Sequence, residues 1–248
     1  MQKSGKSQLS IVIPFYNEEE CVGSVCNEVY DVLSGSIDIP WELIMVNDGS
    51  ADNTPDMINS LAQKHELFRA IHLSPHSGQS AALEAGIQAS QGAIIGTLDG
   101  DGQNDPRDLR ILLDEMEKRQ VDMMCGIRKK RADSLVRKMS GTIANRIRSA
   151  IIRDNISDVG CSIRVFNRNC FGRIHFFRNA HRFFPALVLA AGYTVAETPV
   201  NHRPRKKGRS KYGQGIYSRL FAGIVDLAGV YWLRKRSLNY SVHGEEDK

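Results

Sequence analysis

Short apolar runs alternate with amphipathic stretches through the first half of this 248-residue chain, and this alternation constrains the fold most strongly. The runs are nearly continuous in apolar residues, which is typical of strands buried on both faces of a parallel sheet. Helices that connect such strands cover both faces. We therefore predict an α/β fold with strands at 10–16, 41–50, 68–74, 92–99 and 121–127, helices at 18–33, 77–90 and 106–119, and a further helix capped by Thr54 before Pro55.

Acidic residues follow three of the predicted strands. Glu18 to Glu20 come after the first strand, Asp48 closes the second, and Asp99 and Asp101 follow the fourth. The carboxyl ends of parallel strands lie at one edge of a sheet, and ligands of such folds bind there. We expect these carboxylates to converge on one site.

The stretch TLDGDGQNDPRDL, residues 97–109, is the densest of these acidic groups. An EF-hand calcium loop needs glycine at its sixth position and glutamate at its twelfth, but counting from Asp99 gives Asn104 and Arg110. An aspartyl-nucleophile phosphatase is disfavoured because Gln103 stands where such enzymes usually carry Thr or Val. The remaining interpretation is a D-x-D pair that holds Mg²⁺ or Mn²⁺ against a nucleotide diphosphate.

Two further acids in this stretch have simpler structural explanations. Asp105 precedes Pro106, so we predict that Asp105 is a helix N-cap. Asp108 falls in the first turn of the same helix, where a negative charge is favourable.

The second half of the chain is less regular and much more basic. Residues 1–127 hold 8 Lys/Arg and 20 Asp/Glu, whereas residues 128–248 hold 25 Lys/Arg and 8 Asp/Glu. The basic half should meet an anionic partner such as phosphate, a membrane surface or nucleic acid. We predict helices at 134–152, 181–193 and 214–236, strands at 158–168 and 194–200, and a basic loop at 202–213.

These elements suggest a division of the chain. We predict a catalytic domain over 1–213, made of a nucleotide-binding half, 9–127, and an acceptor-binding half, 128–213. Residues 214–248 would form a C-terminal helix and an acidic tail.

No apolar run is long enough for a transmembrane helix, and the polar start MQKSGKSQLS leads us to expect no signal peptide. Five cysteines without a C-x-x-C pair are typical of reduced thiols, so we expect a cytoplasmic protein. The segment 215–236 ends in an aromatic pair, Tyr231 and Trp232, followed by three basic residues. It could lie in a membrane interface, pack on the core or a second subunit, or meet a membrane-anchored partner subunit.

The motifs IVIPFYNEEE, VNDGS, SGQSAALEAG and LDGDGQNDP together resemble family 2 glycosyltransferases, which have the nucleotide-sugar-binding GT-A fold. HRFFPAL, ETPVNHRPRKKGRSKYG and DLAGVYWL narrow the resemblance to the polyprenyl- and dolichyl-phosphate sugar synthases, a group that includes dolichol-phosphate mannose synthase. The resemblance covers about residues 9–236 and implies a mostly parallel sheet flanked by helices.

The resemblance also implies roles for individual residues. Asp101, Arg128 and Arg137 would be catalytic, and Asp99, Asp101 and Gln103 would surround the Mg²⁺ or Mn²⁺ ion and the diphosphate. The nucleotide would contact Pro14, Tyr16, Glu18, Asp48 and Asp99, and the acceptor phosphate and the loop closing over the donor would involve Arg128, Arg137, Ser140, Arg209, Ser210 and Lys211.

One departure from the wider family is informative. Members that glycosylate hydroxyls carry an acidic E-D pair as a base, often with Q-x-x-R-W, and neither motif occurs here. A hydroxyl must lose a proton to attack, whereas a phosphate monoester, with a second pKa of about 6, is already ionised at neutral pH. The absence of an obvious base favours a phosphate acceptor.

The expected activity is an inverting transfer of a sugar to a polyprenyl or dolichyl phosphate at the cytoplasmic face of a membrane. Mannose from GDP-mannose is the commonest donor sugar among the families that this sequence resembles, and UDP-sugars such as glucose, N-acetylhexosamines or uronic acids are the alternative. Two further hypotheses are transfer to a hydroxyl acceptor, with Asp158 as the available acid, and a non-catalytic nucleotide-sugar-binding module. Nucleic acid is not an expected partner.

Overall fold

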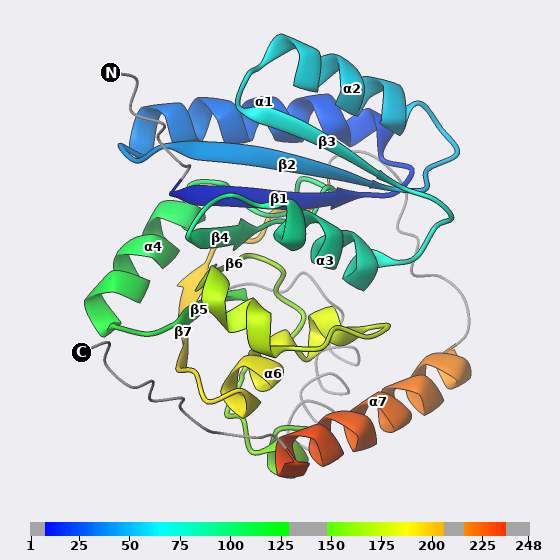
Figure 1. The fold of residues 1–248 in the computed structure, drawn as a ribbon, viewed down its shortest axis with the longest axis vertical. Coiled ribbons are helices and arrows are strands. Elements are labelled where there is room, and N and C mark those ends of the chain that lie inside the picture. Colours follow the sequence, from blue (N-terminus) through cyan, green and yellow to red (C-terminus); the bar gives the residue numbers. More distant parts are fainter. Residues whose placement is uncertain (1–7, 129–147, 206–215, 237–248) are drawn as a thin grey trace, which may run out of the picture.

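A computed structural model describes residues 8–128, 148–205 and 216–236. In this part of the chain one sheet has the strand order β3-β2-β1-β4-β6-β5-β7 (Figure 1). Strand β6 runs antiparallel to both of its neighbours, and the other pairs are parallel. The strands are β1 Leu9–Phe15, β2 Trp41–Asp48, β3 Phe68–Leu73, β4 Ile94–Thr97, β5 Met123–Arg128, β6 Arg164–Asn167 and β7 Val195–Val200.

Helices cover both faces of this sheet. The buried residues of α1, α2 and α4 pack in one core cluster, and those of α3 and α6 pack in a second cluster on the opposite face. A third cluster joins α7 to α6. The helices are α1 Glu19–Ser36, α2 Thr54–Lys64, α3 Gln79–Ala89, α4 Asp108–Arg119, α6 Phe184–Ala190 and α7 Ile216–Arg236, with 3₁₀ turns η1 Arg168–Arg173 and η2 Ala180–Arg182.

The predicted mostly parallel α/β fold is confirmed, and the five first-half strands lie where the apolar runs placed them. Some details differ. The predicted strand 158–168 is shorter, because only Arg164–Asn167 pairs with neighbouring strands. The predicted helix 181–193 is the turn η2 followed by the seven-residue α6. The prediction of Thr54 as an N-cap was wrong: Asn53 is the N-cap, and the Thr54 hydroxyl instead accepts a hydrogen bond from the Glu18 amide.

The reversed strand β6 determines which loops share an edge. Thr97, at the end of β4, pairs with Arg164, at the start of β6. The loop that enters β6 therefore lies at the edge where β1, β2 and β4 end.

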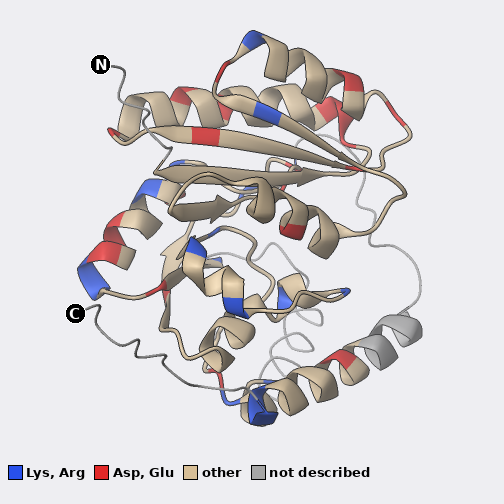
Figure 2. Ribbon diagram, viewed as in Figure 1, with Lys and Arg blue, Asp and Glu red and all other residues tan. Residues whose placement is uncertain are grey.

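Figure 2 shows where the charges lie on this fold, with basic residues gathered at the end of α7. That cluster is Arg234, Lys235 and Arg236. Among the described helices, none is both long and apolar enough to cross a bilayer. All five cysteines are free and buried, and burial raises the pKa of Cys125 to about 12, as expected for packing residues. The proposed domain boundary at residue 213 and most of the predicted helix 134–152 lie outside the described residues.

Candidate functional site

Two adjoining cavities lie at the carboxyl edge of the parallel strands. The first, of about 360 Å³, extends from Pro14 and Asp48 to Arg205. The second, of about 330 Å³, extends from Thr97 to Arg128. Both are lined by the same five residues where they meet: Gln79, Asp99, Asp101, His181 and Arg182. A larger cavity of about 660 Å³, near Gln8 and Gln120, is lined by none of the predicted site residues.

Asp48 forms the inner end of the first cavity. Its buried carboxylate accepts hydrogen bonds from the amides of Ser77 (2.8 Å) and Gly78 (2.9 Å). Gly78 has a φ of +92°, a backbone conformation that favours glycine. His76 Nδ1 lies 3.0 Å from the same carboxylate, and the His76 ring stacks on Tyr16 with centroids 3.8 Å apart. The predicted residues Tyr16 and Asp48 are thus brought together by His76, which the sequence analysis did not identify.

An arginine that was not predicted links two of the predicted acids. Arg205 Nη1 lies 3.2 Å from Glu18 Oε1, and its Nη2 lies 2.8 Å from Asp101 Oδ2. All three side chains are at most one-fifth exposed. Arg205 belongs to the basic HRPR stretch, but only the three-dimensional structure identifies its partners.

Asp99, like Asp101, lines both cavities. Gln79 Nε2 donates a hydrogen bond of 2.8 Å to its carboxylate. Loss of hydration and the nearby Asp101 charge raise the pKa of Asp99 to about 6. A nearby cation would lower this pKa again, because it stabilises the charged carboxylate.

Gln103 lies at the outer side of this acidic loop, where it is held by the chain that leaves β7. The Arg203 amide donates to Gln103 O (2.9 Å), and Gln103 Nε2 donates to Arg203 O (3.2 Å). Asn104 and His202 form an isolated antiparallel bridge beside them. The D-x-D loop is therefore supported by residues about one hundred positions later in the sequence.

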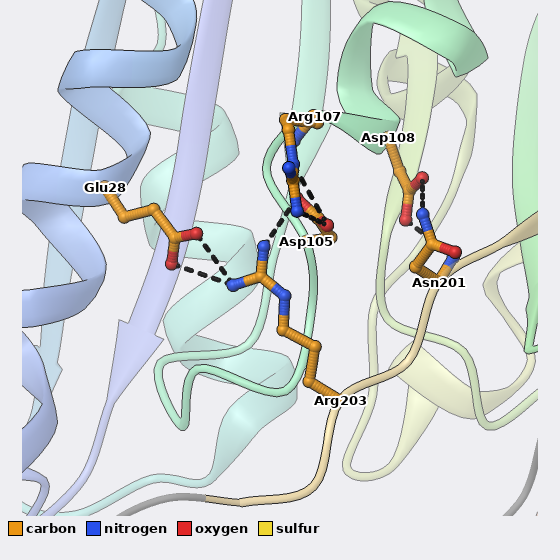
Figure 3. A network of polar contacts seen from close by, with 6 residues as sticks. All are labelled: Glu28, Asp105, Arg107, Asp108, Asn201 and Arg203. Carbon is orange, nitrogen blue, oxygen red and sulfur yellow. Dashed lines mark hydrogen bonds and ion pairs between the residues drawn. The ribbon is translucent and has the colours of Figure 1, made fainter.

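A polar network fixes the base of the same loop (Figure 3). Arg203 spans Glu28 of α1 and Asp105, with N–O distances of 2.7 Å to each. Asp105 also pairs with Arg107, so its pKa lies well below the usual range. The prediction of Asp105 as the N-cap was wrong, since Arg107 holds that position.

Asp108, the other acid with a predicted structural role, links α4 to the chain after β7. Its carboxylate accepts hydrogen bonds from the amide (2.7 Å) and side chain (3.1 Å) of Asn201. It is buried in the first turn of α4, so it makes specific tertiary contacts in addition to the expected favourable position.

The carboxylates fit a metal that also takes ligands from a diphosphate. Within the described residues, no group of three or more His, Cys, Asp or Glu side chains is arranged to hold a metal alone. Mg²⁺ and Mn²⁺ need no such cage, because they are commonly held by one or two carboxylates together with substrate phosphates and water. Asp99 and Asp101 supply that pair of hard oxygen ligands, with Gln103 next to them.

Arg128, which the sequence analysis expected at the acceptor phosphate, lines the second cavity and is paired with an acid. Its Nε and Nη2 donate to both oxygens of Asp158 at 2.8 and 2.7 Å. The amides of Ser157 and Asp158 donate in turn to Glu197 of β7. Asp158, the acid considered for a hydroxyl acceptor, therefore neutralises Arg128. The other predicted site residues, Arg137, Ser140, Arg209, Ser210 and Lys211, lie outside the described residues.

A mostly parallel sheet of this topology, with an acidic loop beyond its strands and a cavity against that loop, has the GT-A nucleotide-sugar-binding fold. Glucosyl-3-phosphoglycerate synthase from Mycobacterium tuberculosis, solved with Mn²⁺, UDP and glucosyl-3-phosphoglycerate, has the same fold: TM-score 0.64, 17% identity, covering 92% of this chain and 80% of that one. Residues 10–174 match the family model described as Glycosyl transferase family 2. The chain belongs to this family.

Two related proteins indicate which members of the family this chain resembles in sequence. A dodecaprenyl-phosphate galacturonate synthase from Rhizobium johnstonii is 36% identical over 236 residues, which cover 92% of this chain and 68% of that protein. An undecaprenyl-phosphate 4-deoxy-4-formamido-L-arabinose transferase from Pectobacterium carotovorum is 31% identical over 207 residues, covering 82% of this chain and 62% of that protein. The chain thus spans about two-thirds of the length of both relatives.

Proposed function

We propose that this protein transfers a sugar from a UDP-sugar to a polyprenyl phosphate and forms a lipid phosphosugar. The observation that carries this proposal is the Asp99–Asp101 pair at the junction of two cavities, one for each substrate. The names of the two relatives specify polyprenyl-phosphate acceptors and support this acceptor class. They specify galacturonate and an arabinose derivative, so the expectation of mannose from GDP-mannose is not confirmed and the UDP-sugar alternative is favoured.

The nucleotide fits the first cavity. The Asp48 carboxylate is an acceptor for the base or its ribose, and Tyr16 and His76 offer ring surfaces beside it. Asp99 and Asp101, with Gln103 nearby, would hold Mg²⁺ or Mn²⁺. The metal would neutralise charge on the leaving diphosphate. Placement of the two substrates in adjoining cavities would align them for direct transfer.

The second cavity suits an acceptor that needs no general base. Among the described residues that line it, the only carboxylates are Asp99 and Asp101, which we assign to the metal. His202 also lines it, with Nε2 3.5 Å from the side-chain nitrogen of Gln103. So does His181, but burial, Arg182 and Arg164 lower the pKa of His181 to about 3. An imidazole with so low a pKa is a weak base. A polyprenyl phosphate, already ionised, can attack without losing a proton.

Helix α7 supports a peripheral position on the membrane, which we propose to be its cytoplasmic face. Leu227, Val230 and Leu233 pack on the protein core. The opposite side of the helix exposes Ile224, Val225, Tyr231 and Trp232, by 57, 54, 44 and 61%. Apolar and aromatic side chains followed by a basic cluster are typical of helices in a membrane interface.

The test is sugar transfer to fluorescent undecaprenyl phosphate from a panel of UDP- and GDP-sugars. Reactions contain Mn²⁺ or EDTA and use the wild-type protein or Asp101→Asn. We expect one UDP-sugar to give a lipid product with Mn²⁺, with no product in EDTA and a loss of at least about 100-fold in Asp101→Asn. Arg110→Gln, which removes a charge from the exposed surface of α4 away from both cavities, is the control and should keep wild-type activity. Transfer to a hydroxyl acceptor instead of the lipid phosphate would contradict the proposal.

A further inference from the structure

Arg182 lies where the two cavities meet. It is one of the five residues that line both, and its side chain is exposed to solvent. It follows His181 at the end of η2, in the HRFFPAL motif. The sequence analysis assigned no function to this residue.

The backbone next to Arg182 is anchored from two other elements. Ser80 of α3 bonds to His181 Nδ1 at 2.8 Å, and the His181 amide donates to the Ser80 hydroxyl at 3.2 Å. Arg164 of β6 donates to His181 O at 2.9 Å. Contacts from α3 and β6 thus fix the backbone at His181. The Cα of Arg182, the next residue, is thereby held beside the point where the two cavities meet.

The other arginines around these cavities already have partners: two form ion pairs with acids, and one is buried and donates to backbone carbonyls. Arg128 pairs with Asp158, and Arg205 pairs with Glu18 and Asp101. Arg164 is buried and donates to the carbonyls of Val159 and His181. Among the residues that the structure describes, Arg182 forms no ion pair and no side-chain hydrogen bond. Its positive charge is available to a ligand.

We propose that Arg182 is a catalytic residue that binds the phosphate of the lipid acceptor. This inference rests on the proposed function. The donor diphosphate would have the metal and Arg205 on the side of the first cavity, whereas the acceptor phosphate enters the second cavity, where the charge of Arg128 is already neutralised. A guanidinium can donate two parallel hydrogen bonds to one phosphate.

Binding at this point places the acceptor for the chemical step. A phosphate oxygen of the acceptor forms a bond to C1 of the sugar, and the bond between C1 and the diphosphate oxygen breaks with its electron pair leaving on the nucleoside diphosphate. No proton is transferred. Arg182 would hold two anions close together by reducing their mutual repulsion.

The experiment compares Arg182→Gln, Arg182→Lys and the control Arg178→Gln with the wild type. Arg178 is an exposed arginine four residues earlier that lines neither cavity. Initial rates give kcat and KM for undecaprenyl phosphate, and calorimetry gives the Kd of UDP with Mn²⁺. For Arg182→Gln we expect KM for the lipid to rise at least about tenfold, from loss of a charge-assisted contact. In Arg182→Lys the KM for the lipid should rise less than in Arg182→Gln, because the charge is kept. In both variants the Kd of UDP should stay within about twofold of the wild-type value.

The outcomes separate this inference from the proposed function. Wild-type transfer to the lipid phosphate is established first, and its failure overturns the proposed function together with this role of Arg182. If the wild type is active, an unchanged KM for the lipid in both variants overturns the inference alone. A weaker Kd of UDP with an unchanged KM for the lipid assigns Arg182 to the donor and also overturns it. Thermal unfolding of each variant verifies folding, and Arg182→Lys retains the charge if Arg182→Gln is unstable.

Discussion

The guanidinium of Arg205 lies 2.8 Å from the carboxylate of Asp101, which we assign to the metal. The other oxygen of Asp101 accepts a hydrogen bond from the Gln103 amide at 3.1 Å. Both oxygens are therefore engaged before any metal binds. A divalent cation that approaches this oxygen from the side of Arg205 would compete with the guanidinium, and we propose that metal binding displaces Arg205 from Asp101.

Replacement of Arg205 by Gln should therefore strengthen Mn²⁺ binding to the nucleotide-free protein. We expect the Kd for Mn²⁺ to fall about three- to tenfold, which corresponds to loss of one partly buried competing ion pair. Electron paramagnetic resonance of free Mn²⁺ measures this without any substrate. Arg110→Gln, which removes an exposed pair with Asp114, should leave the Kd unchanged. An unchanged or weaker affinity in Arg205→Gln would show that the two cations do not compete.

Replacement of Asp158 by Asn tests whether this acid orients Arg128 or acts as a base. Asn retains one oxygen for Arg128 but removes the charge that neutralises it. If Asp158 has a positioning role, kcat should fall by less than about tenfold, whereas loss of a general base typically costs about 10²–10⁴-fold. Steady-state kinetics across pH 6–9 measures this, because loss of a base also removes the acidic limb of the profile. A loss above 100-fold with the lipid acceptor would restore Asp158 as a base.

Replacement of Arg203 by Gln should destabilise the fold. Arg203 connects α1 to the loop after β4 through Glu28 and Asp105, and Asp105 is only 3% exposed (Figure 3). Arg107 remains bound to Asp105, so we expect a loss of about 1–3 kcal/mol rather than the larger cost of an unpaired buried charge. Urea denaturation followed by circular dichroism measures it. The control Arg110→Gln should change the free energy of unfolding by less than about 0.5 kcal/mol.

The stabilisation from Asp105 should also depend on pH. Arg107 and Arg203 hold the pKa of Asp105 well below its usual value, so the folded protein keeps this carboxylate charged where the unfolded chain protonates it. The contribution is complete above the unfolded pKa of about 4 and is lost as the pH falls below it. The difference in unfolding free energy between wild type and Arg203→Gln should therefore be largest near pH 6 and smaller near pH 3. A difference that grows towards pH 3 would contradict this sign.

Replacement of Trp232 by Glu should weaken association with membranes. Trp232 is 61% exposed on the side of α7 that faces away from the core. Loss of one inserted indole should reduce partitioning into anionic vesicles by about tenfold, as measured by co-sedimentation. Ile111→Glu on α4 is a matched control, because Ile111 is also an exposed apolar residue, at 44%, on a different helix. Equal effects of both substitutions would show that α7 is not the docking surface.

The strands and the edge that carries the acids could be predicted because each depends on local sequence. Nearly continuous apolar runs define β1 and β2, and the acids that follow them lie together because parallel strands end at one edge. The direction of β6 could not be predicted, since four residues carry no signal of strand orientation. The pairings of Arg128 with Asp158 and of Arg205 with Asp101 depend on side chains brought together by tertiary folding. The sequence identifies these arginines as basic residues, but it does not reveal that acidic side chains neutralise their charges.

The reversal of β6 has a consequence for how such a protein can diversify. The segments that leave β1, β2 and β4 hold the first cavity, while the segment that enters β6 supplies much of the wall of the second. Val159 and Gly160 of this segment line the second cavity but not the first, and neither is buried, so changes at these two positions can reshape the second cavity without shifting the strands beside the first. If the second cavity holds the acceptor, as we propose, exchange of these two residues between family members should change the acceptor and keep the donor.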